Sequence, residues 1–309
     1  FLADRRPDDA LRLWPRRRGG EKLQVVATAN FKGGSSKTTT SIHLSHYLAL
    51  QGYRVLCIDL DPQASMTSIF GLQPEFDVGE NETVYAALRY DNERRPLSDV
   101  IRESYFPGID LIPGNLELMD FEFDTPAYLA QRERDELGLF FERLKNAIAS
   151  VEGEYDFVVL DTPPSLGYAT LAALYAATGL IVTVHPAMLD VASCNQFLIM
   201  ISDLADTLAQ FGARFDHDFL KFLMTRVNPN DGPQKYMSSV MRRLFENDVL
   251  VYEAIESTAI AGAGVAKKSL YELESGEVGR EALKRAIESA DNVNGEILAL
   301  LRAVWGRAS

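Results

Sequence analysis

A phosphate-binding loop is the clearest chemical signal in the sequence. The run FKGGSSKTTT (31–40) follows a strand-like run (23–30) and opens a helix-like run (38–50). A glycine-rich turn between a strand and a helix lets backbone N–H groups and the helix N-terminus face an anion, and Lys37 adds a positive charge. We therefore expect Lys37 to reach the β- and γ-phosphates of a nucleotide and Thr38 to bind Mg²⁺.

The loop departs from the general pattern G-x-x-x-x-G-K-[ST]. When the pattern is aligned on Lys37, its two glycine positions are filled by Phe31 and Ser36. We expect Ser36 to crowd the loop or to alter turnover. The plain alternative is a polar turn with incidental lysines. The residues expected to bind the nucleotide are Lys32, Gly33, Gly34, Ser35, Ser36, Lys37, Thr38 and Thr39.

Three aspartates follow two strand-like runs. Asp59 and Asp61 end the run RVLCIDLD, and Asp161 ends the run FVVLD. Because ligands bind parallel α/β sheets at the carboxyl ends of the strands, these acids are expected at one edge. We assign Asp61 to orienting an attacking water, and Asp59 and Asp161 to the coordination sphere of Mg²⁺. A simple Asp-Pro turn is the alternative for Asp61.

Composition bounds the class of protein. The 309 residues are 47% hydrophobic and 24% charged, and no apolar run approaches a membrane span. The net charge of −13 means that any contact with nucleic acid requires a local basic patch. The cysteines, Cys57 and Cys194, lie in apolar runs and are expected to be buried in a reducing compartment.

Apolar runs alternate with amphipathic ones along the chain. This alternation predicts an α/β fold: a doubly wound, mostly parallel sheet with helices on both faces. We predict strands at 23–30, 54–59, 109–112, 155–161, 179–185 and 219–225. We predict helices at 38–51, 132–151, 165–177, 189–211 and 234–247, and one or two more between 277 and 307.

The ends of the chain and one central segment differ from this pattern. Residues 1–22 are polar and arginine-rich, and we expect a basic linker or the remnant of a region that precedes them. The family resemblance given below implies that this region binds DNA. Residues 23–309 are expected to form one ATPase domain. The segment 73–135 is rich in acids, proline and glycine, and we expect an insertion over the sheet edge.

The motifs together resemble a known family. Lys32-Gly-Gly-x-x-Lys-Thr, Asp59-x-Asp-Pro-Gln and Asp161-x-Pro-Pro are similar to the motifs of the ParA/MinD-type deviant-Walker ATPases. Further segments resemble the RepA-type partition ATPases of repABC plasmid operons. These segments are 113–119, 185–191, 228–234, 257–260 and 270–272. The resemblance extends from about residue 16 to residue 307, well beyond the nucleotide motifs.

The resemblance implies a P-loop ATPase that segregates plasmids. It implies Mg²⁺-dependent hydrolysis of ATP to ADP with weak intrinsic turnover, catalysed by Lys32, Lys37 and Asp61. Lys32 would reach across a nucleotide-sandwich homodimer to the partner's phosphates, and a trans-acting cation of this kind couples hydrolysis to the dimer state. It also implies base contacts from Arg226 and Asn228, and a centromere-binding partner of the ParB or RepB type.

The resemblance further implies binding to non-specific double-stranded DNA, with a cytoplasmic, nucleoid-associated location and no membrane partner. The basic candidates are Arg242, Arg243, Lys267, Lys268, Lys284 and Arg285, although basic pairs on helices are usually just solvated. Two alternatives stay open. One is a nucleotide-gated repressor of its own operon, and the other is a MinD-like positioning ATPase bound to membrane through residues 296–305.

Overall fold

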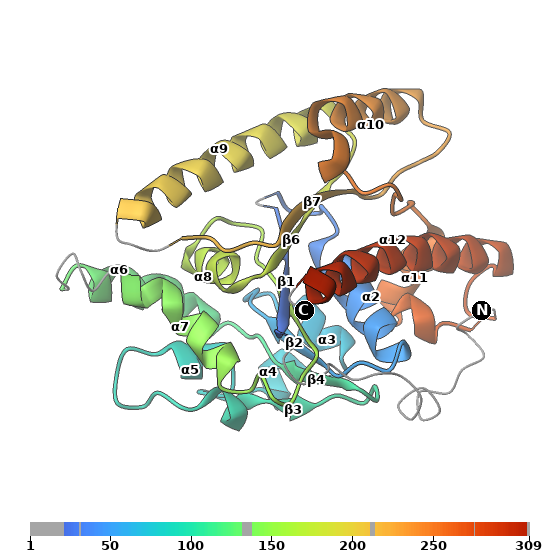
Figure 1. The fold of residues 1–309 in the computed structure, drawn as a ribbon. Helices are drawn as coiled ribbons and strands as arrows, with labels where there is room; N and C mark the ends of the chain where they lie inside the picture. Colours follow the sequence, from blue (N-terminus) through green and yellow to red (C-terminus); the bar gives the residue numbers. More distant parts are fainter. Residues whose placement is uncertain (1–21, 31, 132–137, 211–213, 275, 308–309) are drawn as a thin grey trace.

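A seven-stranded sheet forms the centre of the molecule (Figure 1). The computed structural model describes residues 22–30, 32–131, 138–210, 214–274 and 276–307. The strand order is β3-β4-β2-β5-β1-β6-β7, and β3 pairs antiparallel with β4 while every other pair is parallel. The strands are β1 (Gln24–Ala29), β2 (Val55–Asp59), β3 (Arg102–Glu103), β4 (Ile109–Ile112), β5 (Phe157–Asp161), β6 (Gly179–Val184) and β7 (Phe219–Met224).

The register of the central strands aligns their carboxyl ends. In the β1–β5 pair Thr28 lies opposite Asp161, and in the β2–β5 pair Asp59 lies opposite Asp161. Every residue of β1, β2, β5 and β6 is buried, as expected for strands covered on both faces. Loops that leave these strands therefore meet at one edge of the sheet.

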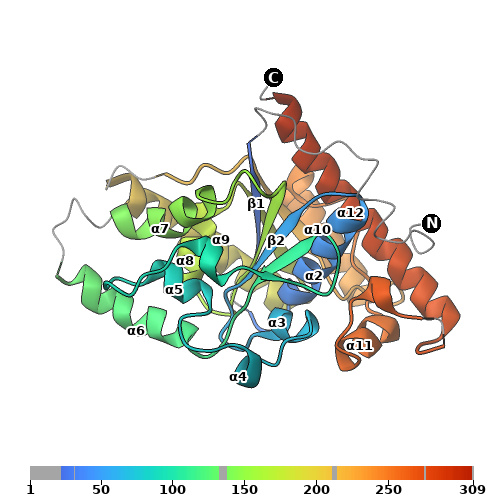
Figure 2. The same cartoon turned by 90° about the horizontal axis from the view of Figure 1, so that it is seen from below.

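Helices cover both faces of the sheet. In the views of Figures 1 and 2, α7 and α8 lie on one side of the strands, and α2 and α12 lie on the other. The longer helices are α2 (Lys37–Leu50), α6 (Leu118–Leu129), α7 (Gly138–Ala149), α8 (Tyr168–Ala176), α9 (Met188–Gln210), α10 (Gly232–Phe245), α11 (Thr258–Val265) and α12 (Arg280–Arg307). Among the described residues, shorter helices include α3 (Ser65–Ile69), α4 (Pro74–Asp77), α5 (Val84–Leu88) and the 3₁₀ turns Leu97–Val100, Glu246–Asp248 and Leu270–Glu272.

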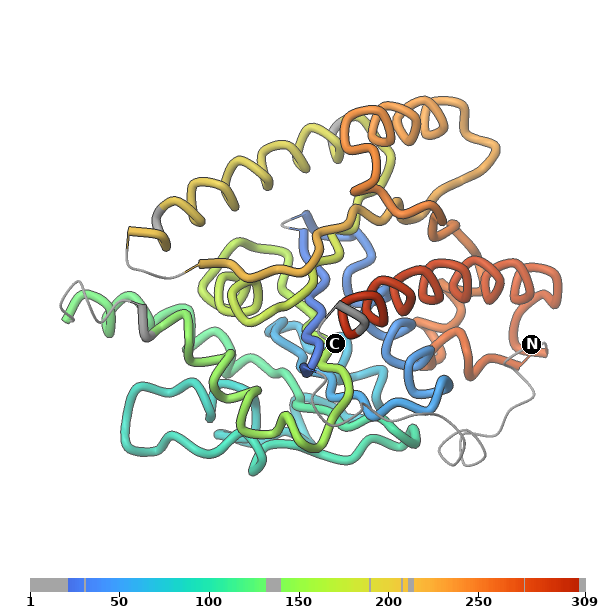
Figure 3. The backbone as a smooth tube through the Cα atoms, viewed as in Figure 1, coloured from blue at the N-terminus to red at the C-terminus, as the bar shows by residue number. Residues whose placement is uncertain are grey.

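The alternation of side chains along β1 divides the core between the two faces. Val25 and Ala27 pack in the cluster that includes the apolar residues of α7 and α8. Val26 points to the opposite face and packs in the cluster that includes residues of α2 and α12. Figure 3 shows that α12, near the end of the chain, lies beside α2, near its beginning. Residues far apart in the sequence therefore build one layer.

The fold class and the six strands predicted from the sequence are confirmed. The predicted helices are also present, although residues 132–137, at the start of the helix predicted at 132–151, lie outside the described residues. The tail forms a single helix, α12. The prediction of an insertion over the sheet edge at 73–135 was wrong, because this segment supplies β3 and β4 and is itself the edge.

The C-terminal segment packs against the sheet. The Trp305 ring stacks against Phe157 with 5.0 Å between ring centroids, and its indole N–H donates to the Lys22 carbonyl at 3.0 Å. Both cysteines are buried, as predicted. Over the described ranges, no helix has the length and apolar character needed to cross a membrane. Residues 1–21, including the predicted basic linker, lie outside the described part of the chain.

Candidate functional site

The loop between β1 and α2 forms an open cradle. The backbone at Ser36 is left-handed, with φ of 67°, and α2 begins at the next residue without a side-chain cap. The first backbone N–H groups of a helix have no partner within it, so those at the start of α2 are free to bind an anion. Lys37 is only 6% exposed, and its ammonium donates to the Lys32 carbonyl at 3.3 Å. The loop therefore gathers one buried cation and unpaired amide donors.

Hydrogen bonds from three strands fix this loop in place. The Asn30 amide donates to the Thr183 carbonyl at 2.6 Å, which links the end of β1 to β6. The buried Ser35 accepts the Thr183 hydroxyl at its Oγ and the Thr225 hydroxyl at its carbonyl, at 3.1 and 3.0 Å. The loop also turns sharply at Gly34, whose φ of +76° lies in the left-handed region that favours glycine. The cradle is thus held by β1, β6 and β7 together.

Asp59 and Asp161 lie buried at the ends of adjacent strands. Asp59 accepts hydrogen bonds from the backbone N–H and the hydroxyl of Thr67, at 2.8 and 2.7 Å. Asp161 accepts from the Ser41 hydroxyl at Oδ1 at 3.1 Å, while its buried Oδ2 has no hydrogen-bond partner in the described structure. Burial, and then the charge of Asp161, raises the pKa of Asp59. Burial likewise raises the pKa of Asp161.

Asp61 extends this acidic group toward the loop. Its carboxylate accepts from the Gln63 backbone N–H at 2.9 Å, and its own N–H donates to Asp59 at 3.2 Å. Burial raises the pKa of Asp61, while the Lys37 charge opposes the rise. Burial lowers the pKa of the Lys37 ammonium, and the charges of Asp161 and Asp61 oppose that change. One buried lysine thus interacts with two carboxylates.

This set of donors fits a magnesium ion that arrives with a nucleotide. The unpaired Oδ2 of Asp161 and the like-charge pressure on Asp59 are both relieved by a nearby cation. Thr38 lies in the first turn of α2, where a hydroxyl ligand is expected. However, the described residues contain no group of three or more acidic, histidine or cysteine side chains arranged to hold a metal by themselves. Phosphate oxygens would have to complete the coordination.

The second loop lysine is engaged within the chain. The Lys32 ammonium lies 2.8 Å from the Asp190 carboxylate, and the exposed side-chain fractions are 39% and 10%. Asp190 is in the first turn of α9, which follows β6. Because β1 and β6 are neighbours in the sheet, the segments after them meet at the same edge. Asp190 is therefore placed next to the loop by the sheet, although it lies far from Lys32 in the sequence.

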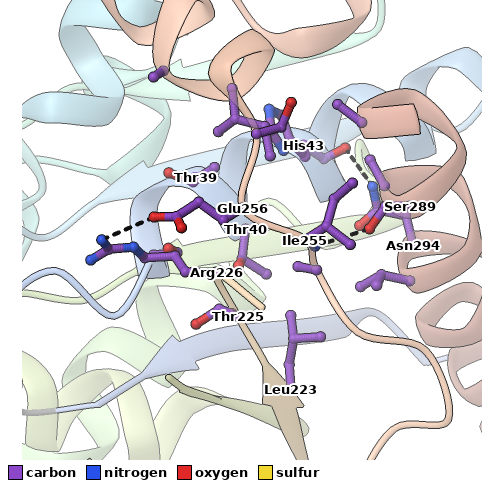
Figure 4. Close-up of a pocket in the computed structure, with 18 residues that line it drawn as sticks. Thr39, Thr40, His43, Leu223, Thr225, Arg226, Ile255, Glu256, Ser289 and Asn294 are labelled. Carbon is purple, nitrogen blue, oxygen red and sulfur yellow. Dashed lines mark hydrogen bonds and ion pairs between the residues drawn. The ribbon is translucent and has the colours of Figure 1, made fainter. Parts of the chain in front are cut away.

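A cavity of about 260 Å³ opens beside the cradle (Figure 4). Ser36 and Thr39 line its loop side, and α12 contributes Ala286, Ala290 and other small side chains. At the rim, Arg226 pairs with Glu256 at 3.4 Å, as Figure 4 shows. A mostly small and apolar wall next to a phosphate cradle suits a flat base.

The structure separates the two residues predicted to contact a base. Arg226 lines the cavity, and its guanidinium also donates to the Gly34 carbonyl at 3.4 Å. Asn228 is exposed, does not line the cavity, and accepts the Asn230 backbone N–H at 2.9 Å in its own turn. The sequence analysis did not predict several lining residues, because they carry no motif. These include His43, Ile255, Glu256, Ser289 and Asn294.

The six basic candidates have different surroundings. Arg242 donates to the Leu250 and Val251 carbonyls and pairs with Glu253, so it holds α10 to the following loop. Lys268 pairs with Glu277 at 2.7 Å, and Lys284 lies 3.9 Å from Glu288. The other three are exposed, and no ion pair forms at them among the described residues. These three are Arg243, Lys267 and Arg285.

Known proteins are similar to this chain in sequence and in fold. The family model for an AAA domain matches residues 23–211. A replication protein A of Rhizobium rhizogenes is 50% identical over 96% of this chain and 73% of its own length. A ParA family protein of Chlamydia muridarum is 33% identical over 59% of this chain and 67% of its own length.

A solved structure is also similar to this chain in fold and in sequence. Cobyrinic acid a,c-diamide synthase from Mycobacterium smegmatis, determined with bound ADP and magnesium, superposes with a TM-score of 0.64. It is 29% identical, with 84% of this chain and 98% of that chain covered. The resemblance drawn from the sequence motifs is therefore confirmed. The chain belongs to the ParA-type family of P-loop ATPases.

Proposed function

We propose that this protein is a Mg²⁺-dependent ATPase of plasmid partition that alternates between a free monomer and a DNA-bound ATP dimer. The observation that carries the proposal is the convergence of Lys37, the free N-terminus of α2 and three aspartates beside a base-sized cavity. Membership of the ParA-type family supports the partition role, and the Rhizobium rhizogenes relative is named for replication. A centromere-binding protein of the ParB or RepB type would stimulate hydrolysis and so release the DNA.

The residues of the cradle divide the work on ATP. The amides of α2 and the Lys37 ammonium bind the phosphate oxygens and stabilise the negative charge that develops on them. Asp61, whose carboxylate is held by the Gln63 N–H, orients the attacking water. Thr38, Asp59 and Asp161 would hold Mg²⁺, which supplies further neutralisation of phosphate charge when bound. Lys32 would act on the phosphates of a second chain.

Sandwich dimerisation explains how the rate of ATP hydrolysis can depend on the presence of a second chain. A monomer lacks the trans-acting cation, so its hydrolysis is expected to be slow. ATP favours the dimer because it bridges two chains, and loss of the γ-phosphate removes that preference. DNA contacts from both chains would then add only in the ATP state. The exposed Arg243, Lys267 and Arg285 are the basic candidates that remain free for such contacts.

Co-sedimentation with random-sequence duplex DNA tests this proposal. We expect ATP-dependent binding of the wild-type chain, loss of binding in Lys37→Ala, and persistent binding without hydrolysis in Asp61→Ala. Replacement of Arg243 and Arg285 by alanine should weaken binding and reduce its salt dependence. Arg242→Ala is the matched comparison, since that arginine is used inside the fold. DNA binding that ignores the nucleotide would contradict the switch.

The N-terminal region decides between partition and autorepression. We propose that residues 1–22 link the ATPase domain to a DNA-binding region. Footprinting on the operon promoter, with chains that contain and lack that region, separates site-specific repression from non-specific binding. Flotation with anionic liposomes tests the membrane alternative, for which the packing of Trp305 in the core offers no support.

A further inference from the structure

Lys32 is the loop residue that would contact the phosphates of a partner chain. In the single chain its ammonium already forms an ion pair with Asp190. Its ammonium lies 2.8 Å from Asp190 Oδ2. A contact of this length between a full cation and a full anion is a charge-assisted hydrogen bond, which is among the stronger interactions available to side chains. The Lys32 ammonium must therefore leave Asp190 before it can bind a phosphate of a second chain.

The backbone of Lys32 is held by hydrogen bonds at both its N–H and its carbonyl. Its N–H donates to the Asn30 side chain at 2.9 Å, and its carbonyl accepts the Lys37 ammonium at 3.3 Å. Asn30 is in turn bound to the Thr183 carbonyl of β6. Rotation about the four side-chain bonds of Lys32 is therefore the simplest way to redirect its ammonium. The loop itself need not be rebuilt.

Asp190 is placed to hold the lysine and to resist losing it. Its side chain is 10% exposed, so water can solvate the carboxylate only in part once the ammonium has left. It lies in the first turn of α9, where the partial positive charge of the helix N-terminus attracts a carboxylate. Among the described residues, Lys32 is its only ion-pair partner. Departure of Lys32 thus leaves a poorly solvated anion behind.

We propose that Asp190 is a positioning residue that holds Lys32 in the monomer and releases it when two chains close around nucleotide. The inference rests on the proposed function, because the second destination of Lys32 is the phosphate group of the partner chain. The pair sets a threshold: dimerisation proceeds only when phosphate attracts the lysine more strongly than Asp190 does. Asp190 thereby keeps the nucleotide-free chain monomeric and makes closure depend on the charge of the bound nucleotide.

The first test examines the contact without any nucleotide. Reductive methylation with formaldehyde and a borane, followed by peptide mass spectrometry, gives the rate at Lys32 relative to the exposed Lys267. We expect Asp190→Asn to raise this ratio about tenfold. Asp206→Asn removes the same charge from an exposed position on α9 and should leave the ratio unchanged. An unchanged ratio in Asp190→Asn would overturn the proposal.

A measurement on the wild-type chain covers the case in which the variant does not fold. Raising the salt concentration from about 0.05 M to about 1 M weakens a partly exposed ion pair. The methylation ratio of Lys32 to Lys267 should therefore rise several-fold in the unmodified protein. A ratio that does not respond to salt counts against a holding contact.

The second test examines the consequence for assembly. Sedimentation with Mg²⁺ and a non-hydrolysable ATP analogue should show Asp190→Asn dimers at about hundredfold lower protein concentration than the wild type, because each dimer releases two Lys32–Asp190 pairs and each is worth about tenfold. In a Lys32→Met background, Asp190→Asn should have no effect, as a double-mutant cycle requires if Asp190 acts through Lys32. Weaker dimers in Asp190→Asn would mean that Asp190 supports the closed state, which contradicts release.

The two tests separate this inference from the proposed function. A wild-type chain that stays monomeric with nucleotide would refute the dimer switch, whereas the methylation ratio would still report on the contact. Normal dimerisation with an unchanged methylation ratio would refute the holding role of Asp190 and leave the switch intact.

Discussion

Gly114→Ala is the substitution that most directly tests how the segment from Asp59 to Asp61 is held in place. Gly114 follows β4, and its N–H donates to the Thr67 hydroxyl at 2.8 Å. A Cβ atom at this position would lie 3.0 Å from the Asp61 carbonyl, 3.1 Å from the Asp59 carboxyl carbon and 3.1 Å from the Asp59 carbonyl. Comfortable contacts are about 3.5–4.0 Å, so three neighbours must move by several tenths of an ångström.

These neighbours cannot move cheaply. Two are backbone atoms, and the third belongs to the Asp59 side chain, which Thr67 holds at 2.7 and 2.8 Å. We expect the free energy of unfolding to fall by about 2 kcal/mol, the usual cost of overpacking. Because Asp61 shifts with the segment, we also expect kcat for ATP hydrolysis to fall about tenfold with little change in KM. Urea denaturation and steady-state ATPase assays measure the two effects.

Gly153→Ala is the matched control. Nothing lies within 4 Å of a Cβ built at Gly153, which is in an exposed turn. Both substitutions restrict the unfolded chain in the same way, so the difference in stability between them isolates the steric effect at Gly114. Equal stability of the two variants would refute the packing argument. A destabilised Gly114→Ala variant with normal kcat would refute the link between this contact and hydrolysis.

Ser36→Gly should stabilise the chain by about 0.5 kcal/mol in urea denaturation, because relief of the left-handed strain slightly exceeds the entropy cost of glycine; a clear loss of stability would show that the hydroxyl makes a needed contact. Burial raises the pKa of both Asp59 and Asp161, so the folded chain binds more protons than the unfolded chain between the ordinary aspartate pKa and the raised values. This contribution to stability falls as pH rises through that window, by at most about 1.4 kcal/mol per pH unit for each group, and urea titrations of the wild type and Asp161→Asn across pH 4–7 should differ by such a slope. Burial raises the pKa of the Cys57 and Cys194 thiols to about 12, so neither should react with a thiol reagent at pH 8 until the chain is unfolded, and fast labelling of native protein would contradict their burial.

Much of the fold could be predicted because strands and loops carry local patterns. Buried parallel strands read as continuous apolar runs, and all six predicted ones are present. The helices that were missed lack such a pattern: α6 contains Pro126 and several acids, and α5 is five residues long. The segment 73–135 was predicted only in part: its apolar run at 109–112 indicated β4, but no local pattern indicated the two-residue strand β3, which pairs with β4 at the sheet edge.

The candidate site was predictable where a residue stands next to a strand end. Asp59, Asp161 and Lys37 could be placed at one edge because parallel strands share a direction, and the register indeed sets Asp59 opposite Asp161. The cavity was a different matter. Its walls come from α2, from the segment after β7 and from α12, and Asn228 lies outside it although Arg226 lines it.

The sequence by itself determined the type of loop, the acids at the strand ends and hence the family. These features depend on neighbours a few residues apart, so their geometry follows from backbone conformation alone. Only the tertiary structure decided that Lys32 is bound by Asp190, that Arg242 is committed to the fold and that small side chains of α12 line the cavity. Such partners are set by how β1 lies beside β6 and how α12 packs on α2, and no local pattern records a contact made across the chain.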